Sequence, residues 1–172
     1  WYAQAGLRFE HTHLTGRNVA EHNKQSYSRL FPTLNLSYRA ETGYSLSAAY
    51  SMGINRPRFS DLNPFRYYTT TTDYVSGNAY LSASITHNAE LSFSHKGLYV
   101  VAYTYQLKDG VGYITRFTPD NSQYTTPQNY IDYRKYGVYA SYQKNFTTWW
   151  NVKVGGELFY AKSQSSIDDS QP

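Results

Sequence analysis

The feature that most constrains this chain is an alternation of apolar and polar side chains with a period of two residues. Between Tyr44 and Asn55 the even positions are Tyr, Leu, Ala, Tyr, Met and Ile, whereas the odd positions are Ser, Ala, Gly and Asn. Successive side chains of a β-strand point to opposite faces of a sheet. This segment therefore predicts a strand with one apolar, aromatic face and one small, polar face, and the chain lacks helical periodicity.

Six further segments alternate in a similar way, which predicts an all-β protein with about seven strands. They are residues 1–10, 33–39, 84–95, 98–107, 130–142 and 150–160. The alternation of 98–107 is the weakest: Val100 and Ala102 make one face less polar, and the apolar face is taken as Tyr99, Val101, Tyr103, Tyr105 and Leu107. Strands of soluble domains usually have about 5–6 residues, whereas a tilted strand that crosses a bilayer needs about 9–11. Most of the predicted strands have the longer length.

The connections between the predicted strands are alternately short and long. Residues 40–43, 95–97 and 144–148 are short turns, and residues 11–26, 56–83 and 108–129 are long connections. Outer-membrane barrels have short periplasmic turns and long extracellular loops, and lipid permits spanning strands only in a closed barrel. Strand length and this rhythm favour an antiparallel meander in a transmembrane β-barrel. Aromatic residues near the strand ends are typical of its girdles: Trp1, Tyr2, Tyr38, Tyr44, Trp149, Trp150 and Tyr160.

A soluble sheet offers the alternative interpretation of the same alternation, because one of its faces packs on a core. The chain contains 20 Tyr, 8 Phe and 3 Trp among 172 residues. A soluble, aromatic-rich β module that binds carbohydrate would use such residues. Leu46, Tyr50 and Leu158 face lipid in the barrel interpretation and would be core residues in the soluble one.

Several function classes are excluded by composition. The chain has no Cys, which excludes disulfide scaffolds, thiolate metal sites and thiol nucleophiles. Its net charge of +4 is scattered, so no nucleic-acid partner is expected. No phosphate-binding loop, serine elbow or zincin helix occurs, and we expect neither an enzyme nor a cofactor.

Two histidines could in principle bind a metal, because residues i and i+2 of a strand share a face. They are His11 and His13, with His22 beyond them, and no third ligand is obvious. We expect instead that they mark the exposed start of a loop, with no metal site. Glu90 and Glu157 lie on predicted inner faces without an identifiable acid–base partner.

One segment carries a more specific signal than alternation. Residues 54–65 read Ile-Asn-Arg-Pro-Arg-Phe-Ser-Asp-Leu-Asn-Pro-Phe, and residues 77–81 read Gly-Asn-Ala-Tyr-Leu. This resembles a motif of TonB-dependent outer-membrane receptors, most closely their Bacteroidetes branch. The matching residues are Arg56, Pro57, Asp61, Leu62, Asn63, Pro64, Phe65, Gly77, Asn78 and Leu81. Ala79 stands where that family usually has Pro, which predicts a looser turn because no ring fixes φ.

The resemblance extends over essentially the whole chain and implies a fold and a function. Phe31-Pro32-Thr33-Leu34 resembles a strand opening of the family, and Glu90-Leu91 matches its next strand. Family members are 22-stranded barrels plugged by an N-terminal domain, and they import iron chelates, cobalamin, glycans or peptides. Residues 1–172 are then expected to be a partial outer-membrane β-barrel domain that represents neither the plug domain nor the terminal strand.

The resemblance also implies partners. Outer-membrane lipid would surround the barrel, and a TonB-type protein would supply energy through an N-terminal segment that these residues do not contain. The imported ligand would be a small molecule or a glycan. A surface lipoprotein that covers the barrel is a further partner in this interpretation.

The motif has a structural and a functional interpretation, of which we favour the structural one. Its prolines and its Asp-Leu-Asn-Pro turn would end a strand and fix a loop at the barrel rim. In the functional interpretation, arginines attract an anionic ligand while tyrosine faces stack on sugars or other planar groups. The candidate ligand-binding residues are Arg56, Arg58, Arg66, Tyr67, Tyr68 and Tyr74.

Overall fold

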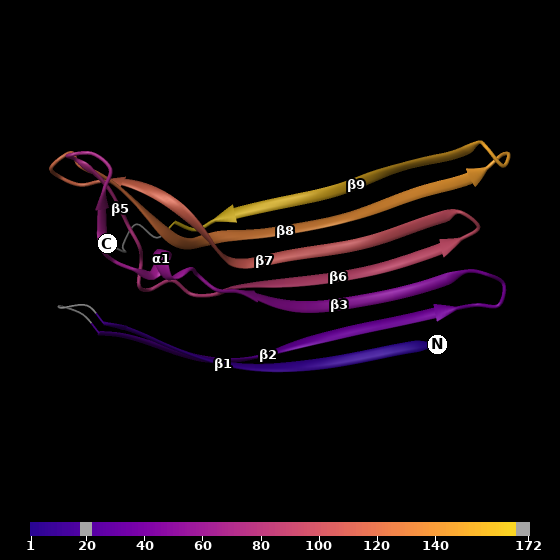
Figure 1. The fold of residues 1–172 in the computed structure, drawn as a ribbon, viewed down its shortest axis with the longest axis horizontal. Coiled ribbons are helices and arrows are strands. Elements are labelled where there is room, and N and C mark those ends of the chain that lie inside the picture. The colour runs from indigo at the N-terminus through magenta and orange to yellow at the C-terminus, as the bar shows by residue number, and fades with distance from the viewer. Residues whose placement is uncertain (18–21, 168–172) are drawn as a thin grey trace.

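Most of the chain forms one continuous, predominantly antiparallel sheet (Figure 1). The computed structural model describes residues 1–17 and 22–167. All seven predicted strands are present and lie side by side in chain order. They are β1 (Tyr2–Arg17), β2 (His22–Arg39), β3 (Ser45–Asn55), β6 (Ser84–His95), β7 (Leu98–Phe117), β8 (Gln123–Asn145) and β9 (Asn151–Ser165). The predicted all-β fold is confirmed.

The long connection after β3 contains structure that the sequence pattern did not predict. It holds the short helix α1 (Phe59–Leu62) and the hairpin strands β4 (Arg66–Tyr68) and β5 (Asp73–Ser76). β5 pairs in parallel with the first residues of β8, so the sheet departs from a simple antiparallel meander here. Strands of three and four residues are too short for alternation to reveal them. No helix among the described residues is long and apolar enough to cross a membrane.

The other two long connections are mostly strand, which corrects the expectation of loops. β1 and β2 pair from Tyr2↔Ser37 out to Arg17↔His22, and β7 and β8 pair out to Phe117↔Gln123. The loop start expected at His11 and His13 is therefore wrong, because both residues lie within β1. These hairpin extensions lack a regular alternation of apolar and polar residues, so their sequence resembles a loop although their backbones are paired.

The short turns are tight, as predicted. The turn between β2 and β3 contains Gly43 with φ +87°, and the turn between β6 and β7 contains Lys96 and Gly97 with φ of 45° and 86°. Glycine adopts positive φ without steric cost. All three short turns lie at one end of the sheet, and α1 and β5 lie at the other end (Figure 1).

The register aligns the apolar side chains of all seven long strands into rows. In one such row each residue is the cross-strand partner of the next, and the row is Ala3, Leu36, Ala48, Leu91, Ala102, Val138 and Leu158. We call the face that carries this row the apolar face and the opposite one the polar face. Leu91 is 52% exposed and Leu158 is 81% exposed. No second layer covers this face within the described part of the chain.

The orientation of β7 corrects the grouping expected from its sequence. Val100 and Ala102 are the partners of Phe93 and Leu91 on the apolar face. Tyr99, Val101, Tyr103 and Tyr105 consequently lie on the polar face. Both faces of this strand carry hydrophobic side chains, so alternation alone could not decide which face is directed toward lipid. The register with β6 and β8 decides it, since a shift of one residue moves every side chain to the other face.

Aromatic rings border the apolar face at the short-turn end. The ring centroids of Trp1 and Tyr38 are 4.3 Å apart, those of Tyr38 and Tyr44 are 5.9 Å apart, and those of Tyr44 and Phe93 are 6.3 Å apart. From Tyr44 to Tyr50 the face extends about 20 Å along β3 at about 3.3 Å per residue. An exposed apolar face bordered by aromatic rings is what the wall of an outer-membrane barrel presents to lipid. Tyr2 lies on the polar face instead, where its hydroxyl donates to Gln4.

Candidate functional site

The two halves of the family-like motif fold against each other. The Gly77 amide donates to the Asn63 carbonyl at 3.0 Å, and the Asn78 amide donates to the Asp61 carbonyl at 2.7 Å. The Ser76 hydroxyl donates to the Pro64 carbonyl at 3.1 Å. A Cβ atom on residue 77 would lie 2.3 Å from the Asn63 oxygen, so only glycine permits this approach. We call this pairing of residues 61–64 with residues 76–78 the motif clamp.

Asn78 fixes the second half of the motif to the sheet. Its Nδ2 donates to the Pro127 carbonyl of β8 at 3.1 Å, and its Oδ1 accepts from the Tyr80 amide at 2.9 Å. The Leu81 amide donates to the Asn78 carbonyl at 3.3 Å, and the Leu81 side chain is 1% exposed. Asn78 thus closes the turn that carries Ala79 in place of the family's proline.

Asp61 connects the first half of the motif to the extension of β7. Its Oδ1 accepts from the Tyr113 hydroxyl at 2.7 Å, and its Oδ2 accepts from the Arg58 amide at 3.3 Å. The hydrogen bond to the Asp61 carboxylate raises the pKa of Tyr113 above its ordinary value, because it stabilises the protonated phenol; partial burial acts in the same direction. The contacts of Asp61, Asn63, Gly77, Asn78 and Leu81 all support a structural role for the motif.

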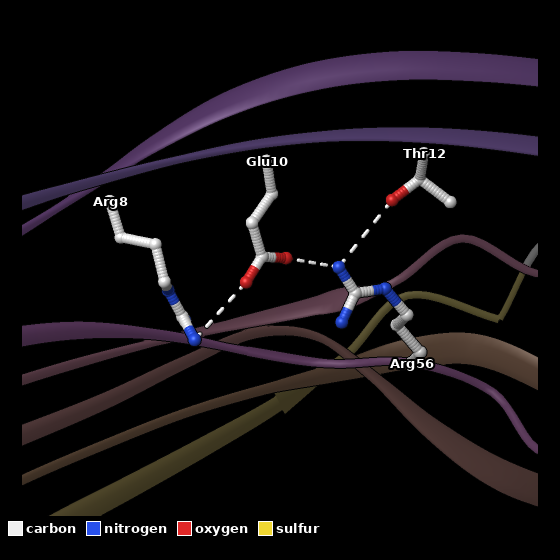
Figure 2. Close-up of polar contacts among 4 residues, drawn as sticks. All are labelled: Arg8, Glu10, Thr12 and Arg56. Atoms are coloured by element: carbon white, nitrogen blue, oxygen red, sulfur yellow. Dashed lines mark hydrogen bonds and ion pairs between the residues drawn. The ribbon is translucent and has the colours of Figure 1, made fainter.

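Arg56 lies on the polar face at the end of β3 and is part of an ion-pair group (Figure 2). It reaches past β2 to the Glu10 carboxylate of β1 and donates to Thr12 Oγ1 at 3.4 Å. Arg8 Nη1 lies 3.1 Å from the other oxygen of Glu10. The hydrogen bond to Glu10 raises the pKa of Arg56. One carboxylate thus contacts two guanidinium groups, which leaves a net positive charge on this part of the polar face.

Arg66 is the first residue of β4 and belongs to a separate group on the β4–β5 hairpin. Its guanidinium carbon lies 4.8 Å from the centroid of the Tyr74 ring. Tyr74 in turn contacts Tyr68 at 5.4 Å and stacks on Tyr124 at 5.5 Å with 10° between the ring planes. The hydrogen bond to Tyr68 raises the pKa of Arg66. We call Arg66, Tyr68, Tyr74 and Tyr124 the tyrosine cluster.

The structure brings together only part of the predicted ligand-binding set. Arg66, Tyr68 and Tyr74 meet in the tyrosine cluster, whereas Tyr67 alternates to the other side of β4, opposite Val75. Arg58 is exposed beside Tyr113, and Arg56 is engaged with Glu10. Within residues 1–17 and 22–167 no contact joins the three arginines to one another.

Two residues of this region were missed at the level of sequence. Tyr124 is about fifty positions from Tyr74 along the chain, and the parallel register Tyr74↔Tyr124 brings them together. Tyr113 lies in a segment that was expected to be a loop. Nothing in the sequence indicated the parallel pairing that brings Tyr124 to Tyr74.

A third polar group lies on the polar face across β7, β8 and β9. Lys135 Nζ is 3.0 Å from Glu157 Oε1, and the Tyr103 hydroxyl also donates to Glu157. The Lys135 ammonium lies 4.2 Å from the centroid of the Phe159 ring. Glu157 is therefore occupied by a cation and a phenol. Glu90 is the cross-strand partner of Tyr103.

The histidines of β1 make short-range polar contacts. His11 Nδ1 lies 2.8 Å from Ser28 Oγ, and His13 Nε2 lies 3.2 Å from Thr15 Oγ1. The side chain of His22 is outside what the structure describes. Among the described residues no three His, Cys, Asp or Glu side chains gather in a group that could hold a metal ion.

Solved structures with a similar fold are described as a siderophore receptor and a ferric enterobactin receptor. The siderophore receptor PirA from Pseudomonas aeruginosa aligns over 83% of this chain with 15% sequence identity and a TM-score of 0.62. A double mutant of the ferric enterobactin receptor PfeA from the same organism aligns over 80% of this chain with 20% identity and a TM-score of 0.57. The chain spans 30% and 23% of the lengths of these two proteins. At these identities the likeness establishes the fold.

The family comparison agrees with the exposed apolar face and the aromatic girdle. No curated protein matches the chain. A family profile described as the outer membrane protein beta-barrel family matches residues 1–171. The predicted bacterial outer-membrane location and the resemblance to receptor barrels are confirmed, and the membrane interpretation is favoured over the soluble module. The chain belongs to the outer membrane protein beta-barrel family, and its strands form a section of such a barrel wall.

Proposed function

We propose that these residues form part of the wall and extracellular surface of a TonB-dependent transporter that imports an anionic iron chelate. The observation that carries the proposal is the tyrosine cluster, which presents a cation and aromatic rings at the long-connection end of a barrel wall. In outer-membrane barrels this end faces the cell exterior. The wall itself resembles those of proteins described as siderophore and ferric enterobactin receptors.

The chemistry of the tyrosine cluster favours a ligand with negative charge and planar groups. The Arg66 guanidinium offers charge and several hydrogen-bond donors, and Tyr68 is 56% exposed, so its ring and hydroxyl are accessible. Asp120 acts on Arg66 only weakly through its charge, and its carboxylate accepts hydrogen bonds from the hydroxyls of Thr118 and Ser122. Cobalamin, glycans and peptides are the competing ligand classes. A ferric catecholate combines net negative charge with planar rings, which cobalamin and neutral glycans do not.

The energy source proposed for import is a TonB-type protein that acts on the N-terminal part of the whole protein. Its support is the membership of the wall in an outer-membrane barrel family and its likeness to receptor barrels. A surface lipoprotein that covers the extracellular opening is a further partner within this proposal.

The test uses the full-length protein in its native outer membrane. Cells are supplied with a radiolabelled ferric catecholate, a ferric hydroxamate, cobalamin or an oligosaccharide, with and without the TonB-type protein. We expect uptake of the ferric catecholate, which is the anionic chelate of the set, to require the TonB-type protein. Binding of this chelate should fall about tenfold in Arg66→Gln and Tyr74→Leu. Tyr80→Leu is the matched control, since Tyr80 is 64% exposed in the same connection and lies outside the tyrosine cluster. Uptake of cobalamin or oligosaccharide instead, or unchanged binding in both variants, would overturn the ligand assignment.

A further inference from the structure

Two cations lie directly opposite each other on the lipid-facing side of the barrel wall. Arg134 of β8 and Lys162 of β9 are cross-strand partners, and both are exposed. They share the apolar face with Val138 and Leu158, because each lies an even number of residues from them. Like charges opposite each other in an antiparallel pair destabilise it. No ion pair with a carboxylate joins either cation among the described residues, and an anion placed between the two cations would remove their repulsion.

Between the middle of the wall and this cationic pair, the cross-strand rows change from apolar to aromatic to cationic, which matches a lipid from its acyl chains to its headgroup. Val138 pairs with Leu158, the next row toward the extracellular end is Tyr136 with Tyr160, and the row after that is Arg134 with Lys162. Apolar, aromatic and cationic side chains thus follow one another within four residues of each strand, about 13 Å. Acyl chains would contact the first row, and a charged headgroup would meet the third.

Polar groups continue sideways from Arg134 on the same face. Gln106 of β7 is its cross-strand partner, and His87 of β6 is the partner of Gln106. Gln106, His87 and Thr104 line a hollow of about 220 Å³ together with Tyr50, Asn88 and Ala89. Thr104 Oγ1 is buried there and has no hydrogen-bond partner. The hollow therefore offers space lined by the polar side chains of Gln106 and His87 beside the cationic pair.

The remaining charged groups of this region leave the positive charge in excess. Lys108 follows Gln106 on the same face of β7, and Asp132 precedes Arg134 on the same face of β8. The Asp132 carboxylate accepts a hydrogen bond of 3.1 Å from the Asp109 amide, in the bulge of β7. Among the described residues, Lys108, Arg134 and Lys162 thus share this part of the apolar face with one carboxylate whose Oδ1 is already engaged, and Asp109 lies in the bulge beyond them.

We propose that Arg134 and Lys162 bind the phosphate of a lipid in the outer leaflet of the membrane. The phosphate lies between the two cations and removes their mutual repulsion, while the acyl chains cover the rows of Tyr136–Tyr160 and Val138–Leu158. Hydroxyl groups of the headgroup reach Gln106 and the hollow beside it. This site lies on the opposite face of the wall from the ion pairs of Arg56 and Lys135, and it is independent of the imported ligand.

The experiment measures lipid binding to the delipidated full-length protein by native mass spectrometry. The probe is lipid A that carries phosphate, compared with the same lipid after enzymatic removal of phosphate. We expect the phosphorylated lipid to bind and the double variant Arg134→Gln, Lys162→Gln to lower its affinity at least tenfold. The double variant Arg134→Lys, Lys162→Arg keeps both charges and should retain binding. Lys144→Gln is the matched control, because Lys144 shares the apolar face at the short-turn end of β8.

Each result decides for or against the proposal. Equal binding of the dephosphorylated lipid, or unchanged binding in the Gln double variant, overturns it. Displacement of the lipid by inorganic phosphate at equimolar concentration also overturns it, since the site would then take the free anion. If the Gln double variant does not fold, the single variants Arg134→Gln and Lys162→Gln replace it, and each should lose part of the affinity. Uptake of iron chelates is measured in parallel, and its absence leaves the lipid result unaffected.

Discussion

The Tyr113 hydroxyl donates a 2.7 Å hydrogen bond to the Asp61 carboxylate, and these two residues are 52 positions apart in the sequence. Asp61 belongs to the motif that follows β3, whereas Tyr113 belongs to the extension of β7. The contact therefore links two long connections that the sequence alone treats as separate loops. Together with the motif clamp, it makes the extracellular end of this wall section one connected unit.

Removal of this hydrogen bond should loosen the connection between β3 and β6. Tyr113→Phe deletes the donor and leaves the Asp61 carboxylate to water, at a cost of about 1 kcal/mol for so exposed a pair. We expect faster hydrogen exchange in residues 58–65 of the full-length protein, measured by mass spectrometry. Tyr80→Phe removes an exposed hydroxyl from the same connection and should leave the exchange rate there unchanged. Equal protection in Tyr113→Phe and the native protein would contradict this assignment.

The same pair predicts a pH dependence at alkaline pH. The pKa of Tyr113 is raised in the folded protein, mainly by its hydrogen bond to Asp61. The stabilisation is therefore fully present below the ordinary tyrosine pKa of about 10 and is lost as the pH rises through the raised value. We expect protease cleavage in residues 56–83 to increase above about pH 10. The informative quantity is the difference between the native protein and Tyr113→Phe, because other tyrosines ionise in the same range.

The motif clamp predicts that Gly77 is intolerant of a side chain. In Gly77→Ala the new Cβ would meet the Asn63 oxygen at 2.3 Å, and relief requires the two backbone segments to separate. We expect a destabilisation of about 1–3 kcal/mol, as for other overpacked positions. The measurement is the denaturant midpoint of the full-length barrel in vesicles. Gly156→Ala is the control, since no atom lies within 4 Å of a Cβ at that position, and its midpoint should stay near the native one.

An introduced charge should cost much more stability on the apolar face of β6 than on its polar face. Leu91 lies in the central row of the apolar face, and Ser92 is next to it on the polar face. Leu91→Arg should destabilise the full-length barrel by about 2–4 kcal/mol, the cost of a cation near the bilayer midplane. Ser92→Arg should cost much less, because its guanidinium enters the wet interior. Comparable losses for the two variants in vesicle folding experiments would argue against the membrane-facing assignment.

Much of the wall could be predicted from the sequence, because the environment on each side of a strand determines which residues occupy successive positions along it. Lipid on one side and water on the other impose alternation, and β3 from Ser45 to Asn55 shows it plainly. Alternation did not predict the orientation of β7, because Val101 and Tyr103 on its polar face are as hydrophobic as Val100 and Ala102 on its apolar face. Its orientation depends on the register with its neighbours, which pairs Ala102 with Leu91.

The candidate site was less accessible to sequence reasoning, because it depends on non-local pairing. Arg66, Tyr68 and Tyr74 are neighbours along the chain and were identified together. Tyr124 joins them through a parallel pairing of β5 with β8 that no turn or alternation indicates. Arg56 was grouped with Arg66 by proximity in sequence, yet its guanidinium is directed to Glu10 on β1.

The motif clamp also bears on how such proteins diversify. Asn63 and Gly77 hold the two ends of the β4–β5 hairpin together at 3.0 Å, so the segment between them begins and ends at nearly the same place. Mutations, insertions and exchanges in that segment can then accumulate during evolution while the strands below keep their register. The hairpin can therefore be exchanged for another segment during evolution. Ligand specificity can change in this way while the sequence of the barrel wall stays the same.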